Sequence, residues 1–406
     1  MPIQSDHIRR LHQAFERARL DDVIAWVDGW AVPLPVEEIP LAQAAGRVLA
    51  HDVPAPLDLP ALDRAAADGF ALRADETVGA SAYNSLTFQL GPAAGGVSAG
   101  GAAAVASGDP LPAGADAVVR LEHAIPESPA AVAVIAPVFA GSEVEPRGSH
   151  IASGGTLLPA ASRPLDAADL GLLAAAGLAR VPVIRRPRVR LLLAAEKLIE
   201  AGQPLTAGEV YNAAGPMLTA LVERDGGGIV ASHRVRRGAA ELRNALSGAD
   251  IVLVVGGTGP GSNDHTAAAL AEAGALAMHG VAIQPGGTAG GGRIDNVAVL
   301  LLPGPPVHAL WAYELIAGRA IRRMAGRCPG LPYRMETLRI ARKIVSEVGT
   351  LEVWPVRRIG PGEVEPMPSL QEAGLAAAAH ADGYILVPEA SEGYPQAASV
   401  PVYLRA

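Results

Sequence analysis

Several residue types are scarce in this chain of 406 residues, and each scarcity excludes a class of protein. The single cysteine, Cys328, excludes an intrachain disulfide framework and a metal site built from several cysteines. No stretch of about 18 apolar residues lacks a charge, so a membrane-spanning helix is not expected. Because the net charge is −8 and basic residues form no run, neither nucleic acid nor an anionic membrane is expected as a partner.

The first residues, MPIQSDHIRR, also lack the apolar segment of a signal peptide. We therefore expect a soluble, cytoplasmic protein. The chain is rich in glycine (46 residues), proline (34 residues) and apolar side chains (50%), a composition typical of a compact α/β protein with many turns. The chain is longer than a single hydrophobic core can support, and its length predicts about two to four domains.

The pattern of apolar residues changes along the chain. Residues 6–30 carry apolar side chains near helical spacing and predict one amphipathic helix. Residues 46–145 combine glycine, proline and short valine and alanine runs, which predicts an all-β insert. A helix is expected within residues 165–183, with Asp166 or Ser162 near its start and Gly177 near its end.

From Pro187 to Gly326, short apolar strands alternate with helices of about 10 to 15 residues. This alternation predicts an α/β unit with a parallel sheet. Residues 333–406 return to strand patterns and predict a small β domain at the end of the chain.

The stretch DIVLVVGGTGPGSND places a glycine-rich loop directly after a buried strand, at Gly256, Gly257, Gly259 and Gly261. Ligands of α/β sheets bind at the carboxyl ends of the strands, where glycines let the backbone approach an anion. No Lys-Ser or Lys-Thr pair follows, and Ser262 stands where a dinucleotide motif has its third glycine. The loop is therefore a candidate phosphate site, and a plain turn between strand and helix is the alternative.

Asp264 closes this loop. A carboxylate beside a phosphate is repulsive unless a cation lies between them, so a functional Asp264 implies a divalent metal such as Mg²⁺. The alternative role of Asp264 is to cap the next helix.

Two further segments are expected at the same edge of the sheet. Residues 283–292, IQPGGTAGGG, are too glycine-rich for the interior of a strand and are expected to form a loop. Residues 300–310, LLLPGPPVHAL, follow a buried strand and start a helix near Pro306 or Val307. Three glycine loops on one rim predict a pocket for an anionic small molecule.

Several segments in order along the chain carry a resemblance to a known family. The stretches AAGRVLAHDVPAPLDLPALDRAAADGFALR, ASGDPLPAGADAVVRLE, GEVYNAAGPML, GGTGPGSND, AIQPGG and LPGPPV resemble motifs of the molybdopterin molybdenumtransferases, a family that includes the gephyrin E domain. The last segment, SLQEAGLAAAAHADGYILVPEASEGYPQAASVPVYL, is similar to the last domain of the family. The resemblance covers nearly the whole chain and suggests a divergent member with eroded active-site motifs.

This resemblance implies a multidomain fold of α/β plus β type. The implied fold contains a three-layer α/β molybdopterin-binding domain, a β-rich insert, a discontinuous linker domain and a C-terminal domain resembling a β-barrel. The expected boundaries are 1–45 and 146–184 for the linker domain, 46–145 for the insert, 185–328 for the α/β domain and 329–406 for the C-terminal domain.

The resemblance also implies a reaction, the insertion of molybdate into adenylylated molybdopterin with release of AMP, assisted by Mg²⁺. It implies a homodimer whose active site lies between the α/β domain of one subunit and the insert of the other. A molybdopterin adenylyltransferase and an apo-molybdoenzyme are the protein partners that such an activity suggests.

Individual residues receive roles from the resemblance. Asp68, Asp264 and Glu196 are implied as catalytic, and Asp264 and Glu196 as the metal ligands. The residues implied in binding the pterin nucleotide are Gly256, Gly257, Thr258, Gly261, Ser262, Pro285, Gly286, Pro303, Gly304 and Arg147.

The sequence departs from the family pattern at several anion-binding positions. Gln284 and Gly287 replace two lysines, Pro305 replaces an asparagine, and the segment from Arg147 to His150 lacks both acids of its motif. Each lost charge-assisted hydrogen bond would weaken anion binding by about 1.5–3 kcal/mol.

Three arginines, Arg64, Arg147 and Arg293, are candidates to compensate for these losses; a solvated surface charge is the alternative for each. Three functions therefore stay open: an active insertase, a catalytically degenerate paralogue that carries or binds a pterin or serves as a scaffold, and a protein acting on a related ligand of another cofactor pathway.

Overall fold

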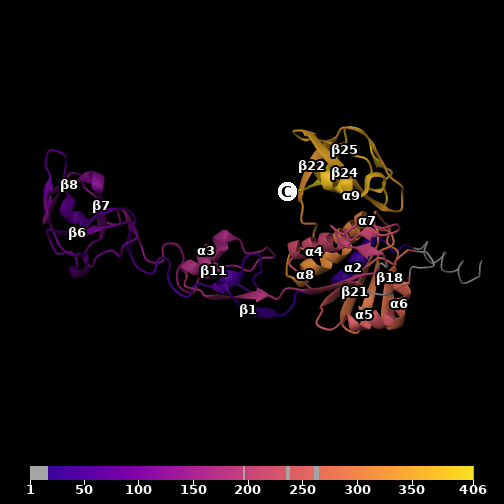
Figure 1. Cartoon of the computed structure of the whole chain (residues 1–406). Coiled ribbons are helices and arrows are strands. Elements are labelled where there is room, and N and C mark those ends of the chain that lie inside the picture. Colours follow the sequence, from indigo (N-terminus) through magenta and orange to yellow (C-terminus); the bar gives the residue numbers. More distant parts are fainter. Residues whose placement is uncertain (1–16, 195–196, 235–237, 260–264, 406) are drawn as a thin grey trace, which may run out of the picture.

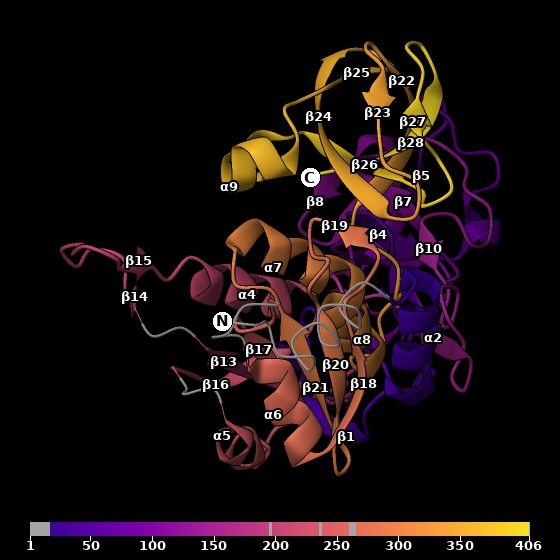
Figure 2. The same ribbon diagram turned by 90° about the vertical axis from the view of Figure 1, so that its right-hand side faces the viewer.

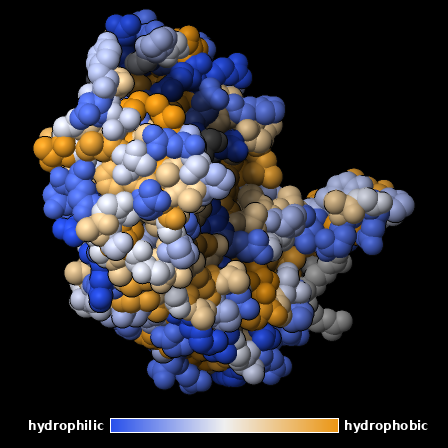
Figure 3. Space-filling model, turned by 90° about the vertical axis from the view of Figure 1, so that its left-hand side faces the viewer, coloured by the Kyte–Doolittle hydropathy of each residue, from blue (hydrophilic) through white to orange (hydrophobic). Residues whose placement is uncertain are grey.

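The computed structural model describes residues 17–194, 197–234, 238–259 and 265–405. The molecule is elongated, with the insert at one end, the linker in the middle, and the α/β and C-terminal domains together at the other end (Figure 1). Seen from the end that carries the insert, polar and apolar side chains are interspersed over the surface (Figure 3). In the described part of the chain no helix has the length and apolar character needed to cross a membrane.

The sheet of the α/β domain has the strand order β16-β13-β17-β21-β20-β18. Neighbours from β16 to β21 run parallel, as predicted, but β20 and β18 are antiparallel. The sheet is therefore mixed: a two-residue hairpin joins β20 to β21 and makes these neighbours antiparallel, and β18 pairs antiparallel with β20 at the edge of the sheet. The strands are β13 (Arg188–Leu193), β16 (Gly228–Arg234), β17 (Ile251–Val255), β18 (Ala275–His279), β20 (Gly290–Ile294) and β21 (Val297–Leu302).

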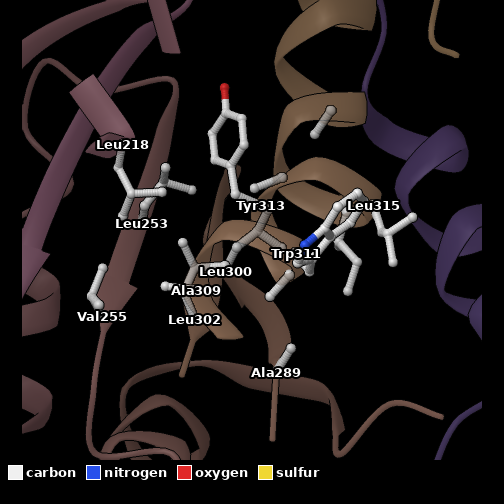
Figure 4. Packing of buried hydrophobic residues seen from close by; sticks show 14 of the residues in the cluster. Leu218, Leu253, Val255, Ala289, Leu300, Leu302, Ala309, Trp311, Tyr313 and Leu315 are labelled. Atoms are coloured by element: carbon white, nitrogen blue, oxygen red, sulfur yellow. The ribbon is translucent and has the colours of Figure 1, made fainter. Parts of the chain in front are cut away.

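Alternate residues of the central strands face opposite sides of this sheet. Leu191 and Leu193 pack into one buried cluster, and Leu192 between them packs into another. The first cluster contains residues of α4 (Ala214–Arg224), α7 (Pro306–Ala312) and α8 (Gly318–Met324), and part of it is drawn in Figure 4. The second contains residues of α5 (Ala239–Asn244) and α6 (Thr266–Ala273). Helices cover both faces, which confirms the three-layer α/β domain.

The glycine run at residues 290–292 lies inside strand β20, so the expectation that this run is a loop is wrong. Glycine is required because the neighbouring strand β18 lies unusually close. A Cβ at Gly290 would lie 2.7 Å from the carbonyl oxygen of Met278, and one at Gly292 would collide with the carbonyl of Ala275. Close approach of backbone, not a turn, explains these glycines.

The first described helix, α2, spans Leu20–Trp30. The predicted start near Asp6 lies outside the described residues, but a single helix over 6–30 is wrong, because Ala18 is bridged to Val281 just before α2. Leu20, Val23 and Val27 are buried in the cluster shared with α8.

The insert is built around a sheet of order β7-β4-β6-β5-β9-β8, as the turn-rich sequence predicts. Its strands are β4 (Gly69–Leu72), β5 (Leu86–Leu90), β6 (Gly101–Val105), β7 (Ala117–Arg120), β8 (Ala124–Ser128) and β9 (Ala131–Val134).

In the linker, β1 (Val36–Pro40) pairs with β12 (Arg180–Ile184). Strand β2 (Val53–Pro54), which was expected in the insert, pairs here with β11 (Thr156–Leu158). Helix α3 (Ala167–Ala175) begins at the capping box formed by Asp166 and Asp169. The prediction of this helix start at Asp166 is confirmed.

The C-terminal domain contains a closed barrel, in the order β24-β25-β22-β28-β26 with β26 pairing back to β24. The predicted barrel-like domain is thereby confirmed. Helix α9 (Leu370–His380) lies at its side (Figure 2). Strand β19 (Ile283–Gln284) of the α/β region pairs with β24, which ties the two domains together. The barrel strands are β22 (Arg334–Ile340), β24 (Leu351–Gly360), β25 (Glu363–Pro366), β26 (Gly383–Val387) and β28 (Ser399–Leu404).

Candidate functional site

Three glycine loops meet at one edge of the α/β sheet. The N–H of Gly256 donates a hydrogen bond to the carbonyl of Leu302 at 2.9 Å, and a Cβ at Gly304 would lie 3.6 Å from the Cα of Gly256. The hydroxyls of Thr258 and Thr288 lie 3.1 Å apart. Segments 256–258, 285–288 and 303–304 thus form a common rim, as the sequence predicts, and we refer to them as the glycine rim.

The glycine rim follows from the direction of the strands. Because β17 and β21 are parallel neighbours, Gly256 and Pro303 leave the sheet at the same edge. Gly256 (φ +94°) and Gly257 (φ +69°) adopt the left-handed conformation that glycine accepts readily. A Cβ at Gly256 would lie 3.0 Å from the carbonyl oxygen of Ala194. A residue larger than glycine would therefore strain the loop where it enters the rim.

Hydroxyl groups fix the first loop. Thr266, buried at the start of α6, donates its hydroxyl to the carbonyl of Gly256 and its N–H to the carbonyl of Gly257, both at 3.0 Å. The position before it, His265, is the N-cap and makes no side-chain capping bond. The alternative of Asp264 as the helix cap concerns a residue outside the described part of the chain.

Two imidazoles border the glycine rim. His279 Nε2 lies 2.8 Å from the carbonyl oxygen of Thr258, and the N–H of Gly286 donates to His308 Nδ1 at 3.2 Å. Burial lowers the pKa of His308 from its ordinary value of 6.5. Because Nδ1 accepts a hydrogen bond, the neutral ring carries its proton on Nε2, which remains a donor.

The described residues at and beside the rim supply backbone N–H groups, hydroxyls, imidazoles and the guanidinium of Arg17, whose Cζ would lie 3.2 Å from a Cβ at Gly287. This donor set suits an oxyanion, whereas Mg²⁺ prefers carboxylate oxygens and water. Within the described ranges no group of three or more histidine, cysteine, aspartate or glutamate side chains could hold a metal ion. Asp264 and Glu196, the predicted metal ligands, and the predicted rim residues Gly261 and Ser262 all lie outside those ranges.

A second polar site lies on the insert. Its pocket has a volume of about 540 Å³ and is lined by Arg64, Ala65, Ala66, Ser107, Gly108, Val144, Glu145 and Pro146. Asp68, the predicted catalytic acid, is exposed beside it and accepts a hydrogen bond from the N–H of Ser107 at 2.7 Å.

The arginines expected to compensate for lost donors have partners of their own. Arg147 donates from Nε to Asp58 at 2.5 Å, and Arg64 forms an ion pair with Glu145. Arg293 lies opposite Ala298 at the start of β21, at the edge of the sheet away from the glycine rim. The expectation that Arg293 serves the rim is therefore wrong.

Within one chain, Asp68 and Arg147 are not brought to the glycine rim. The insert and the α/β domain occupy opposite ends of the molecule, with α3 and β11 between them (Figure 1). Sequence reasoning missed Thr266, His279 and Thr288 at the rim. Of these three, Thr288 could have been found from the sequence, because it places a hydroxyl beside the glycines of the predicted loop segment 283–292.

Comparison with known proteins identifies the family. Residues 11–177 match the model of the MoeA N-terminal region (domain I and II), residues 197–323 the model of a probable molybdopterin binding domain, and residues 337–404 the model of the MoeA C-terminal region (domain IV). The chain belongs to the MoeA family. The family resemblance noted in the sequence is thereby confirmed over nearly the whole chain.

Relatives in the MoeA family include curated enzymes. The chain is 34% identical over 316 residues to molybdopterin molybdenumtransferase 2 of Mycobacterium tuberculosis, covering 73% of this chain and 76% of the relative. It is 29% identical over 398 residues to the molybdopterin molybdenumtransferase of Synechococcus elongatus, covering 92% and 95%.

A crystal structure of the molybdopterin biosynthesis MoeA protein from Pyrococcus horikoshii OT3 superposes with a TM-score of 0.78. At 26% identity it covers 96% of this chain, and the match includes 100% of that structure. The multidomain MoeA-like fold is thus confirmed.

Proposed function

We propose that the chain is a molybdopterin molybdenumtransferase, which inserts molybdate into adenylylated molybdopterin and releases AMP during molybdenum cofactor biosynthesis. The observation that carries this proposal is the convergence of three glycine loops, from segments 256–258, 285–288 and 303–304, in a member of the MoeA family. The rim presents N–H and O–H donors to an anion, and the phosphates of a pterin nucleotide are such anions.

The roles of single residues extend this proposal. The glycine rim binds the phosphates of the pterin nucleotide, and His308 donates from Nε2 toward them. The same proposal keeps Pro285, Gly286, Pro303 and Gly304 as binding positions, and Asp264 and Glu196 as ligands of Mg²⁺. Asp68 acts from the insert.

A homodimer is part of the proposal, because Asp68 directly precedes β4 of the insert, and one chain holds the insert and the α/β domain at opposite ends (Figure 1). A second copy that places its insert against the α/β domain of the first would bring them together. Such a dimer works in the cytoplasm with a molybdopterin adenylyltransferase as supplier and an apo-molybdoenzyme as acceptor.

The deciding experiment is a reconstitution with purified protein, adenylylated molybdopterin, Mg²⁺ and molybdate. We expect AMP release that depends on molybdate and stops when the divalent cation is chelated. The matched control is Asp264→Ala, which should abolish turnover while circular dichroism and melting temperature stay unchanged. Bound pterin without AMP release would contradict the enzymatic proposal and point to a carrier.

A further inference from the structure

We propose that the chain has a binding site for a small dianionic oxyanion at the junction between the linker and the α/β domain. The site is a pocket lined by Arg47, Arg186 and Arg327 together with Gly46, Gly226 and Ile184. It lies between the end of β12 and the end of α8, where the central part of the molecule joins its α/β domain (Figure 1). This inference goes beyond the proposed function and does not use the glycine rim.

Positive charge is concentrated in this pocket although the chain as a whole is acidic. Arg47, with 8% of its side chain exposed, pairs with Glu37 at 2.5 Å and donates to the carbonyl of Ile184. Among the described residues, Arg327 donates to the carbonyls of Arg224 and Gly46 and pairs with no carboxylate. Two positive charges therefore remain in excess, a combination that attracts a dianion.

The third arginine of the pocket is Arg186. Within the described part of the chain, the Arg186 side chain makes no hydrogen bond or ion pair, although it lines the pocket. The nearby Arg188 differs, because its guanidinium contacts both carboxylate oxygens of Asp250 at 3.2 Å. Arg186 is thus the guanidinium whose donors are available to a ligand.

The like charges in the pocket repel one another. Burial is the main cause that lowers the pKa of Arg327, and the negative charge of Asp225 offsets part of this effect. The positive charges of Arg186 and Arg47 lower the pKa of Arg327 further. Asp225 does not neutralise the pocket, since it is buried and paired with Arg224 and Arg322. A bound dianion would relieve this repulsion.

The backbone keeps the pocket open. Gly46, Gly226 and Gly326 have left-handed φ values of +71°, +91° and +72°. A Cβ at Gly226 would lie 2.6 Å from Nε of Arg327, and one at Gly326 would collide with Ile184. Side chains at these positions would displace the arginine or fill the space that it faces.

The size of the pocket limits its ligand. Its volume of about 10 Å³ takes one oxygen-sized group. A tetrahedral oxyanion would insert one oxygen and leave the others at the mouth, where the exposed Arg186 lies. Phosphate, sulfate and molybdate share this shape and charge. Because its walls come from both sides of the junction, the bound anion would hold the linker against the α/β domain.

The test measures binding of phosphate, sulfate and molybdate to the full chain by calorimetry and by melting temperature, at constant ionic strength. We expect binding in the wild type and a loss of affinity of at least about tenfold in Arg186→Ala. Arg188→Ala removes the same charge two positions away and should bind like the wild type. Thr288→Val, altered at the glycine rim, should keep the arginine-dependent binding.

Equal affinities of Arg186→Ala and Arg188→Ala would overturn the proposal, as would the absence of dianion binding by the wild type. Binding of all three anions would support a general dianion site, and binding of molybdate alone would support a second site for the metal substrate. Loss of AMP release without loss of this binding would count only against the proposed function. The two proposals therefore fail separately.

Discussion

At the level of single residues, the glycine rim lacks the two lysines of the family pattern and presents neutral hydrogen-bond donors. Gln284 and Gly287 bring no positive charge of their own, although the guanidinium of Arg17 lies beside Gly287. Thr258, Thr288 and His308 line the same edge. Neutral hydrogen bonds contribute less than charge-assisted ones, so we expect weaker but still specific anion binding.

Removing one hydroxyl of the rim tests this view. Thr288→Val eliminates the contact with Thr258 at 3.1 Å. We expect the dissociation constant of the pterin nucleotide to rise by about two- to tenfold, because a neutral hydrogen bond contributes about 0.5–1.5 kcal/mol. Equilibrium dialysis measures this constant. Thr219→Val, which removes a hydroxyl bonded to Gly215 within α4, is the control and should leave it unchanged. Equal effects of both variants would contradict the assignment.

The ionisation of His308 provides a second test. Its pKa is lowered by burial, so between that lowered value and 6.5 the unfolded chain binds more protons than the folded chain. The free energy of unfolding should therefore rise with pH through this window and fall as the pH drops through the folded-state pKa.

Nuclear magnetic resonance of the imidazole Cε1 proton, assigned with His308→Gln, measures the midpoint. His308→Gln should also flatten the pH dependence of unfolding, whereas His51→Gln, at an exposed position, should leave it as in the wild type. A midpoint at or above 6.5 would contradict the prediction.

At the level of elements, the glycine run of β20 shows where composition misleads. Glycine is depleted in strands in general, so the sequence favours a loop at residues 290–292. The residues form a strand because β18 approaches closely enough to exclude side chains. The strands β17 and β21, by contrast, were predicted because uninterrupted apolar runs are typical of strands buried on both faces.

A substitution in β20 tests this explanation. Gly292→Ala would press a methyl group against the carbonyl of Ala275. We expect the free energy of unfolding to fall by about 1–3 kcal/mol, the usual cost of overpacking. Urea denaturation measures it. Gly228→Ala, in β16 of the same sheet, meets nothing within 4 Å and should change stability little. Similar losses in both variants would contradict the explanation by close packing.

At the level of the whole molecule, the elongated shape separates the two candidate half-sites. The pocket of the insert lies beside Asp68. The rim belongs to the α/β domain, at the opposite end of the molecule from the insert (Figure 1). In the proposed homodimer a second copy would supply the missing half, so that dimerisation would be required for function and would not be only an assembly state.

Mixed dimers test this arrangement. Asp68→Asn and Asp264→Ala should each be inactive alone. When the two variants are unfolded and refolded together, half of the dimers are mixed, and each of these contains one site with neither substitution. We expect AMP release to recover to about a quarter of the wild-type rate. If both residues served one site within a chain, every site would carry a substitution and no activity would return. Refolding each variant alone is the control.

The sequence by itself determined the family, the order of β-rich, α/β and barrel segments, and the glycine loops at the strand ends. These features are local, because turn residues, capping residues such as Asp166 and apolar runs act over a few neighbours. Only the tertiary structure decided the antiparallel strands β18 and β20, the place of Arg293 at the far edge, and the meeting of Thr258 with Thr288. These depend on strand pairing between segments distant in sequence, which no local pattern encodes.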